Sequence, residues 1–150
     1  MSNEQLIQLT KPVSQIFIET KPKAGRDLAF VGHANTCQLL LAAVGPYSWE
    51  KVPGTDLFDK EGNLEAQVWR LTVEIDGKEV SVESTGDYDN MKGKSQGFRA
   101  QVCEGNSYRR AACKIGVFLE GWVDGASKSG MYVLHEHLKS LNGKDLRNDP

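Results

Sequence analysis

The sequence predicts an α+β fold, in which an antiparallel β-meander of three core strands is packed by one long helix. Residues 68–75 alternate between apolar and polar side chains, and Asp76-Gly77 separates them from a second alternating stretch at 78–85. This arrangement is typical of a β-hairpin. Helical periodicity then runs from about residue 96 to 120. A long helix that follows consecutive antiparallel strands buries its apolar side against one face of their sheet.

The segment before the hairpin supplies the first core strand and two shorter helices. In chain order we expect an amphipathic helix at 4–9, a β-like stretch at 14–19, a basic turn at 21–26, a helix at 35–44, the first core strand at 47–52 and a turn-rich excursion at 53–63. Gly45-Pro46 ends the second helix, because glycine caps helices and proline cannot continue them. A last short helix is expected at about 131–141.

The hairpin sequence also predicts its own register. Asp-Gly is a preferred pair for a two-residue type I′ turn, in which both central residues need positive φ. That turn sets the following cross-strand pairs: Val73 with Val80, Leu71 with Val82, Arg70 with Glu83, and Glu74 with Glu79. The first three pairs are favourable, and the exposed glutamate pair carries a small cost.

The long helix presents two different faces when its residues are placed about 100° apart. One side is apolar and holds Tyr108, Ile115, Leu119 and Trp122. The roughly opposite side is cationic or polar and holds Arg99, Asn106, Arg109, Arg110 and Lys114. Fixed cations on a rigid helix suit a phosphate backbone, whereas the alternative interpretation is a solvated surface face. Trp69 and Trp122 are core candidates under either interpretation.

The charge of the chain is uneven. Its net charge of −2 argues against nucleic-acid binding, since most nucleic-acid-binding proteins are basic overall. Residues 86–118, however, hold six cations and three carboxylates, a local charge of +3, which leaves −5 for the remainder. Local potential governs binding, so the objection is weakened.

Length and composition indicate one domain over 1–150, with a core at about 14–122, the helix at about 131–141 and a polar tail. The sequence lacks an apolar run as long as a membrane span, and its start does not resemble a signal peptide. The three cysteines, Cys37, Cys103 and Cys113, cannot all pair within the chain and lack metal-ligand spacing. We therefore expect a cytoplasmic protein with no membrane association.

Enzymatic patterns are weak in this sequence. In His135-Glu136-His137 the two imidazoles would point about 200° apart on a helix, so they could not share a metal ion. Gly93-Lys94-Ser95 ends like a phosphate-binding loop, but Tyr88 stands where that motif requires its first glycine. We expect no catalytic residue, no metal and no cofactor. A small metal-dependent nucleic-acid enzyme ranks last among the hypotheses.

Three segments, in this order, resemble the Rad-fifty-two superfamily of single-strand annealing proteins. They are a helix leading through Gly-Pro into an aromatic strand at 39–49, the charged hairpin at 68–85, and Tyr-Arg-Arg-Ala-Ala-Cys-Lys-Ile-Gly at 108–116. Phage Sak-type annealing proteins and bacterial DdrA-type damage-response proteins look most similar. The resemblance covers roughly residues 14–122 and implies a Rad-fifty-two-like annealing fold.

The resemblance implies ATP-independent binding and annealing of single-stranded DNA, for recombination or repair, in a basic groove of a homo-oligomeric ring or arc. By position, Arg109 and Arg110 match the basic pair that lines the inner groove. Tyr47 or Trp49 falls near the aromatic residue at the start of the first core strand, where core packing is the competing role. The secondary cations expected on this basis and on the helix pattern are Lys92, Lys94, Arg99 and Lys114.

Two positions depart from the pattern of the superfamily. Asn35 stands where a basic residue is usual near the start of the second helix, and Cys113 occupies a position that is usually polar or cationic. Compensation would come from the basic turn, with Lys21, Lys23 and Arg26. A single-strand binding protein or an exonuclease is a candidate partner. The competing hypothesis is a non-catalytic interaction or structural module with a solvated basic face.

Overall fold

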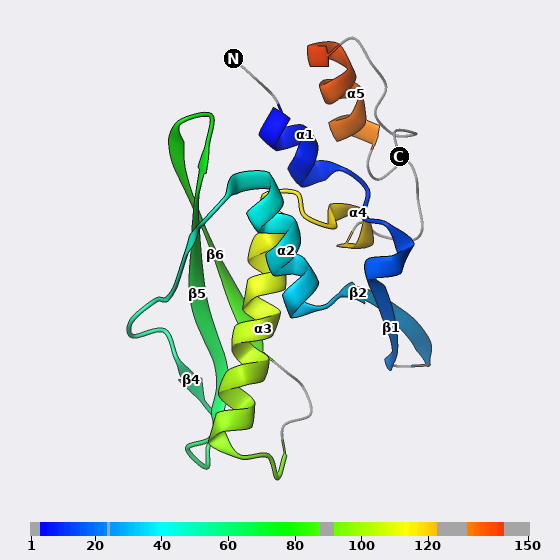
Figure 1. Ribbon diagram of the computed structural model, residues 1–150. Coiled ribbons are helices and arrows are strands. Elements are labelled where there is room, and N and C mark those ends of the chain that lie inside the picture. Colours follow the sequence, from blue (N-terminus) through cyan, green and yellow to red (C-terminus); the bar gives the residue numbers. More distant parts are fainter. Residues whose placement is uncertain (1–3, 24, 88–91, 123–131, 143–150) are drawn as a thin grey trace.

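The computed structural model describes residues 4–23, 25–87, 92–122 and 132–142, and these form an α+β structure with two antiparallel sheets (Figure 1). The elements are α1 (Glu4–Thr10), a 3₁₀ turn (Gln15–Phe17), β1 (Ile18–Lys23), β2 (Arg26–Val31), α2 (His33–Val44), β3 (Ser48–Lys51), β4 (Leu57–Phe58), β5 (Leu64–Ile75), β6 (Lys78–Asp87), α3 (Gln96–Lys114), α4 (Leu119–Trp122) and α5 (Tyr132–Asn142). The expected fold class is therefore confirmed at the level of a long helix packed on antiparallel strands.

The main sheet is built around β5. β6 pairs along one edge of β5, while β3 and the short β4 pair along the other. β3, β5 and β6 are the three expected core strands, but β5 begins at Leu64, four residues earlier than the alternation suggested. The turn-rich excursion contains β4, which was not predicted.

The β5–β6 hairpin has the predicted register. Asp76 and Gly77 have φ values of 51° and 76°, as a type I′ turn requires. Val73 lies opposite Val80, and Arg70 opposite Glu83. An Arg70 guanidinium nitrogen lies 2.7 Å from a Glu83 carboxylate oxygen, so this cross-strand pair forms an ion pair.

α3 lies against one face of the main sheet and is shorter than predicted. It begins at Gln96, where the Ser95 hydroxyl accepts a hydrogen bond from the Phe98 amide at 3.2 Å. It ends at Lys114, because Gly116 and Phe118 adopt φ values of 111° and 53°, which an α-helix cannot accommodate. The expected continuation to residue 120 is wrong.

Because the helix ends at Lys114, the residues expected on its apolar face are not all buried. Tyr108 is buried, and Ile115 packs at the edge of the core. Trp122, now on the separate α4, is 50% exposed, so its assignment to the core is wrong. The other expected core tryptophan, Trp69, is half-buried and stacks on Trp49.

The buried face of α3 is made largely of small side chains rather than large apolar ones. Cys103, Ser107 and Ala111 recur four residues apart and are fully buried. They allow a close approach to β6 at Gly86, where a Cβ atom would lie 1.7 Å from the Cys103 carbonyl oxygen. Only glycine, which lacks a Cβ atom, therefore fits at this position between β6 and α3.

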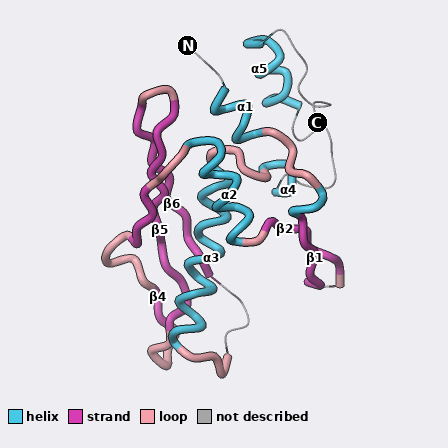
Figure 2. The backbone as a smooth tube through the Cα atoms, in the orientation of Figure 1, coloured by secondary structure: helices cyan, strands magenta, loops and turns pink. Residues whose placement is uncertain are grey.

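A second hairpin, β1–β2, was missed by the sequence interpretation. The expected basic turn at 21–26 is the end of this hairpin, whose strands pair from Ile18↔Val31 to Lys23↔Arg26. α2 begins at His33, two residues before the expected start. The hairpin lies on the side of α2 and α3 away from the main sheet (Figures 1 and 2). α3 is thus flanked by two sheets.

The remaining predicted helices are present. α1 spans Glu4–Thr10, and α5 spans Tyr132–Asn142, each within one residue of its expected bounds. None of the helices in the part of the chain that the structure describes is long and apolar enough to cross a membrane.

Candidate nucleic-acid interface

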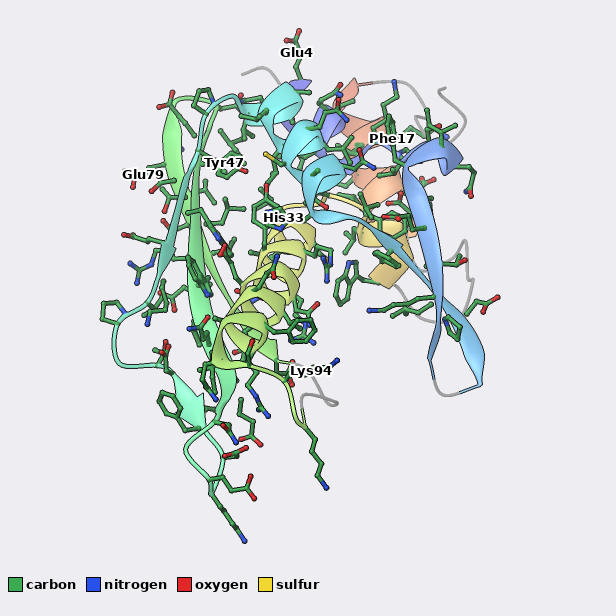
Figure 3. The ribbon with its side chains drawn as sticks, turned by 60° about the horizontal axis from the view of Figure 1, so that its bottom comes forward. Glu4, Phe17, His33, Tyr47, Glu79 and Lys94 are labelled. Carbon is green, nitrogen blue, oxygen red and sulfur yellow. The ribbon has the colours of Figure 1, made fainter. Side chains whose placement is uncertain are left out.

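Tyr47 and Trp49 belong to an aromatic cluster between α2, α3 and the main sheet. The hydroxyl oxygens of Tyr47 and Tyr108 lie 2.5 Å apart, and the Tyr47 hydroxyl also donates to Cys37 Sγ at 3.2 Å. The Trp49 ring meets Tyr108 edge-on at 5.1 Å between centroids. Figure 3 shows Tyr47 and His33 in this space, and the His33 ring is 4.5 Å from that of Tyr108. Both predicted aromatic residues are therefore half-buried and packed against Tyr108.

Arg99, expected on the cationic face of α3, is instead 5% exposed. Its guanidinium donates to the carbonyl oxygens of Leu64 and Lys94, each at 3.2 Å, and lies 4.0 Å from the Asp59 carboxylate. These bonds tie the first turn of α3 to the start of β5. The helical-wheel placement of Arg99 on the exposed cationic face was therefore wrong, because its side chain is buried.

Lys92 and Lys94 are exposed at the N-terminal end of α3, where Figure 3 labels Lys94. The Lys94 ammonium lies 5.2 Å from the centre of the Phe98 ring. With a rise of 1.5 Å per residue, the start of α3 is roughly 20 Å from Arg109. These lysines therefore lie apart from the cations in the C-terminal half of the helix.

Three side chains of the expected cationic face contact the backbone of β6. Asn106 donates to the Asp87 carbonyl at 2.6 Å, Arg110 to the Thr85 carbonyl at 2.7 Å, and Lys114 to the Glu83 carbonyl. The spacing matches, since four helical residues rise about 6 Å and two strand residues advance about 6.7 Å. Each turn of α3 thus matches two residues of β6 along this edge.

These carbonyl groups face the open edge of the sheet. The Val68 carbonyl accepts from the Val52 amide on the β3 side, so it points away from β6. Its cross-strand partner Thr85 accordingly points its own carbonyl away from β5, because backbone groups alternate in an antiparallel pair. Arg110 and Lys114 therefore cover an edge that would otherwise expose unpaired acceptors.

Arg109 points toward the β1–β2 hairpin instead. Its guanidinium carbon lies 5.9 Å from the centre of the Phe30 ring, and one guanidinium nitrogen donates to the Asn106 side-chain oxygen. The half-buried position, and secondarily the neighbouring Arg110, lower the pKa of Arg109, while Glu19 opposes this shift. A cation held in a partly desolvated site interacts more strongly with an anion than a fully solvated one.

A cavity of about 570 Å³ separates α3 from the hairpin. Its lining includes Lys21 and Phe30 from the hairpin, Arg109 and Arg110 from α3, and Trp122 from α4. Lys21 and Phe30 share a face of the hairpin, because Lys21 pairs with Leu28, two residues from Phe30. The Lys21 ammonium lies 5.3 Å from the Phe30 ring centre. Both predicted members of the basic pair therefore line the same cavity.

The electrostatic balance of this cavity favours an anion. Among the described residues that line it, three side chains are cationic, and Asp87 is the one carboxylate. That carboxylate is paired with Arg110, with 2.7 Å between nitrogen and oxygen. Lys21, proposed from the sequence as compensation for Asn35, is present here, whereas the side chains of Lys23 and Arg26 lie outside the described residues.

The other chemistry weighed from the sequence is a metal site. Among the described residues, no three His, Cys, Asp or Glu side chains are placed to hold a metal ion. His137 is exposed on α5, and the side chain of His135 lies outside the described residues. Neither a protein-family model nor a curated protein sequence matches the chain.

Proposed function

We propose that this protein binds single-stranded DNA and anneals complementary strands without ATP, for recombination or repair. The observation that carries the proposal is the cavity between α3 and the β1–β2 hairpin, where Lys21, Arg109 and Arg110 come together beside exposed aromatic surface. Cations next to aromatic rings are what single-strand binding surfaces combine. The position of the basic pair within the Rad-fifty-two resemblance supports the same proposal.

The side chains suit annealing because they can hold a strand without reading it. Arginine and lysine contacts to phosphate carry no sequence information. The planar fork of a guanidinium orders a phosphate better than an ammonium does. A strand held in this way keeps most base edges free to test a second strand.

A subunit with three cations in its cavity would bind DNA weakly alone, because each neutralised phosphate adds only modestly to affinity. We infer a homo-oligomeric ring or arc, in which linked sites bind one strand together. A net charge of −2 is compatible with this arrangement if acidic surface lies outside the basic track. The cytoplasm is the proposed location, with a single-strand binding protein or an exonuclease as the candidate protein partner.

A second hypothesis is a non-catalytic interaction module whose basic face has only a structural role. The observation in its favour is that Arg110 and Lys114 already donate to β6 carbonyls, and that Arg110 is also paired with Asp87. The two hypotheses differ in one measurable respect. Annealing requires a phosphate to recruit Arg109 and Arg110, whereas a structural module requires no anion.

The test is binding of a long oligothymidylate, followed by annealing of two complementary oligonucleotides, without ATP or metal, at about 50 and about 200 mM salt. We expect binding and annealing at the lower salt concentration that decline steeply at the higher one. Absence of binding at low salt would contradict the proposal and favour the structural module.

A further inference from the structure

Two of the aromatic side chains that line the cavity, those of Phe30 and Trp122, have different surroundings. The Phe30 ring is approached by two cations, the Lys21 ammonium at 5.3 Å and the Arg109 guanidinium at 5.9 Å. The ring therefore orders cations that can face a phosphate. Trp122 lines the same cavity and is 50% exposed. An exposed indole beside fixed cations is a stacking surface for a base.

The volume and lining of the cavity exceed what a phosphate needs. About 570 Å³ lies within the range of cavities that hold whole small-molecule ligands. Apolar side chains, including Leu28, Val117 and Phe118, make up much of the lining beside Trp122. A bare phosphate would leave this apolar surface unused, whereas a planar base would cover it.

We infer that the cavity holds one nucleobase of the bound strand, stacked on Trp122, while the adjoining phosphate lies against Arg109 and Lys21. This inference rests on the proposed function and specifies how each subunit binds the strand. The ligand is a nucleotide unit of single-stranded DNA, and the base in the cavity is withheld from pairing until it leaves.

The site is suited to any base rather than to one. Every base offers a π-face for stacking. Asn106, the amide side chain in the lining, already donates to the Asp87 carbonyl and accepts from Arg109. Each end of this amide therefore already makes one hydrogen bond within the protein.

The test compares an ordinary oligonucleotide with an abasic one of equal length, which keeps the phosphates and lacks the bases. We expect the wild-type protein to bind the ordinary strand about tenfold more tightly, the effect of roughly 1.4 kcal/mol of stacking per site. Trp122→Ala should abolish this preference, and Trp122→Phe should retain part of it. Phe58→Ala is the matched control, since Phe58 is 58% exposed on β4, outside the cavity lining.

A second measurement observes the binding of the strand by the protein with its native Trp122. In protein labelled with fluorotryptophan, the Trp122 resonance, assigned with Trp122→Phe, should shift on addition of the ordinary strand and stay in place with the abasic one. Equal affinity for both strands, or an unmoved Trp122 resonance, would overturn the base site and leave phosphate binding intact. Failure to bind either strand would overturn both this inference and the proposed function.

Discussion

At the scale of single residues, the proposed interface depends on how firmly Arg110 is held by Asp87. The two side chains are 2.7 Å apart, with 38% and 49% of their surfaces exposed. An ion pair at such exposure contributes at most about 1 kcal/mol. A phosphate can therefore replace the Asp87 carboxylate at small cost, while the bond from Arg110 to the Thr85 carbonyl keeps the guanidinium in place.

Asp87→Asn should accordingly strengthen DNA binding by about two- to fivefold, because it removes the competing charge, worth about 0.5–1 kcal/mol. Fluorescence anisotropy with labelled oligothymidylate measures the change. Asp56→Asn is the matched control, since it removes an equal charge from the pair with Lys51, whose atoms are 3.1 Å apart outside the cavity lining. Equal effects of both substitutions would show that only net charge matters.

The half-buried thiol of Cys113 and the buried phenol of Tyr108 predict a loss of stability at high pH. Burial, with a smaller contribution from Glu120, raises the pKa of Cys113 to about 11, from an ordinary value of 9.0. Burial also raises the pKa of Tyr108. Since the folded protein favours the neutral forms, their stabilisation is complete below the unfolded pKa and is lost as pH rises through the folded value.

The free energy of unfolding should therefore decline as pH rises from about 9 toward 11, measured by urea denaturation at several pH values. Cys113→Ser removes one titrating group and should make the decline shallower. A free energy that is independent of pH over this interval would contradict the burial of these groups.

At the scale of elements, the molecule is organised by the contact between α3 and β6. Small residues on α3 and Gly86 on β6 bring the two backbones together, and side chains from α3 then reach the outer carbonyls of the strand. The wall of the cavity that carries Arg109 and Arg110 is positioned by this contact.

Gly86→Ala should lower the free energy of unfolding by about 2–3 kcal/mol, because its Cβ would overlap the Cys103 carbonyl oxygen. Gly97→Ala is the matched control on α3, where nothing lies within 4 Å of the new Cβ. That substitution should be neutral or stabilise by up to about 1 kcal/mol. Urea denaturation compares the two, and equal stabilities would contradict the close approach.

The elements that sequence predicted well are those fixed by local chemistry. The β5–β6 register follows from a period of two and from the Asp-Gly turn, both of which are local. The buried and exposed faces of α3 were harder to predict, because a helical wheel treats a helix in isolation. The small residues Cys103, Ser107 and Ala111, at four-residue spacing, were the available sign of the buried face, and they place Arg99 beside it.

At the scale of the whole molecule, the candidate site joins segments far apart in sequence. Lys21 and Phe30 come from the hairpin, and Arg109, Arg110 and Trp122 from α3 and α4. Sequence identified the basic pair and the compensating Lys21, but not the aromatic partners. Two β-like runs around Ala24-Gly25 were a sign of the hairpin, whereas its position beside α3 depends on tertiary packing.

Oligomerisation also belongs to this scale. We expect light scattering coupled to size exclusion to give a mass several times the 16.6 kDa of one chain. In such an assembly, linked sites would raise the affinity for DNA above that of one cavity with few cations. A monomer that binds oligothymidylate as tightly as the assembly would contradict the need for a ring or arc.

The most direct test of the central claim is the annealing rate of Arg109→Ala/Arg110→Ala, measured with complementary oligonucleotides at low salt. We predict normal folding, judged by circular dichroism and thermal unfolding, with annealing slowed about tenfold or more. The matched control is Lys51→Ala/Arg70→Ala, which removes two cations from β3 and β5, outside the cavity lining. This control should anneal like the wild type. Annealing at the wild-type rate by a folded Arg109→Ala/Arg110→Ala protein would contradict the proposal that the cavity binds DNA.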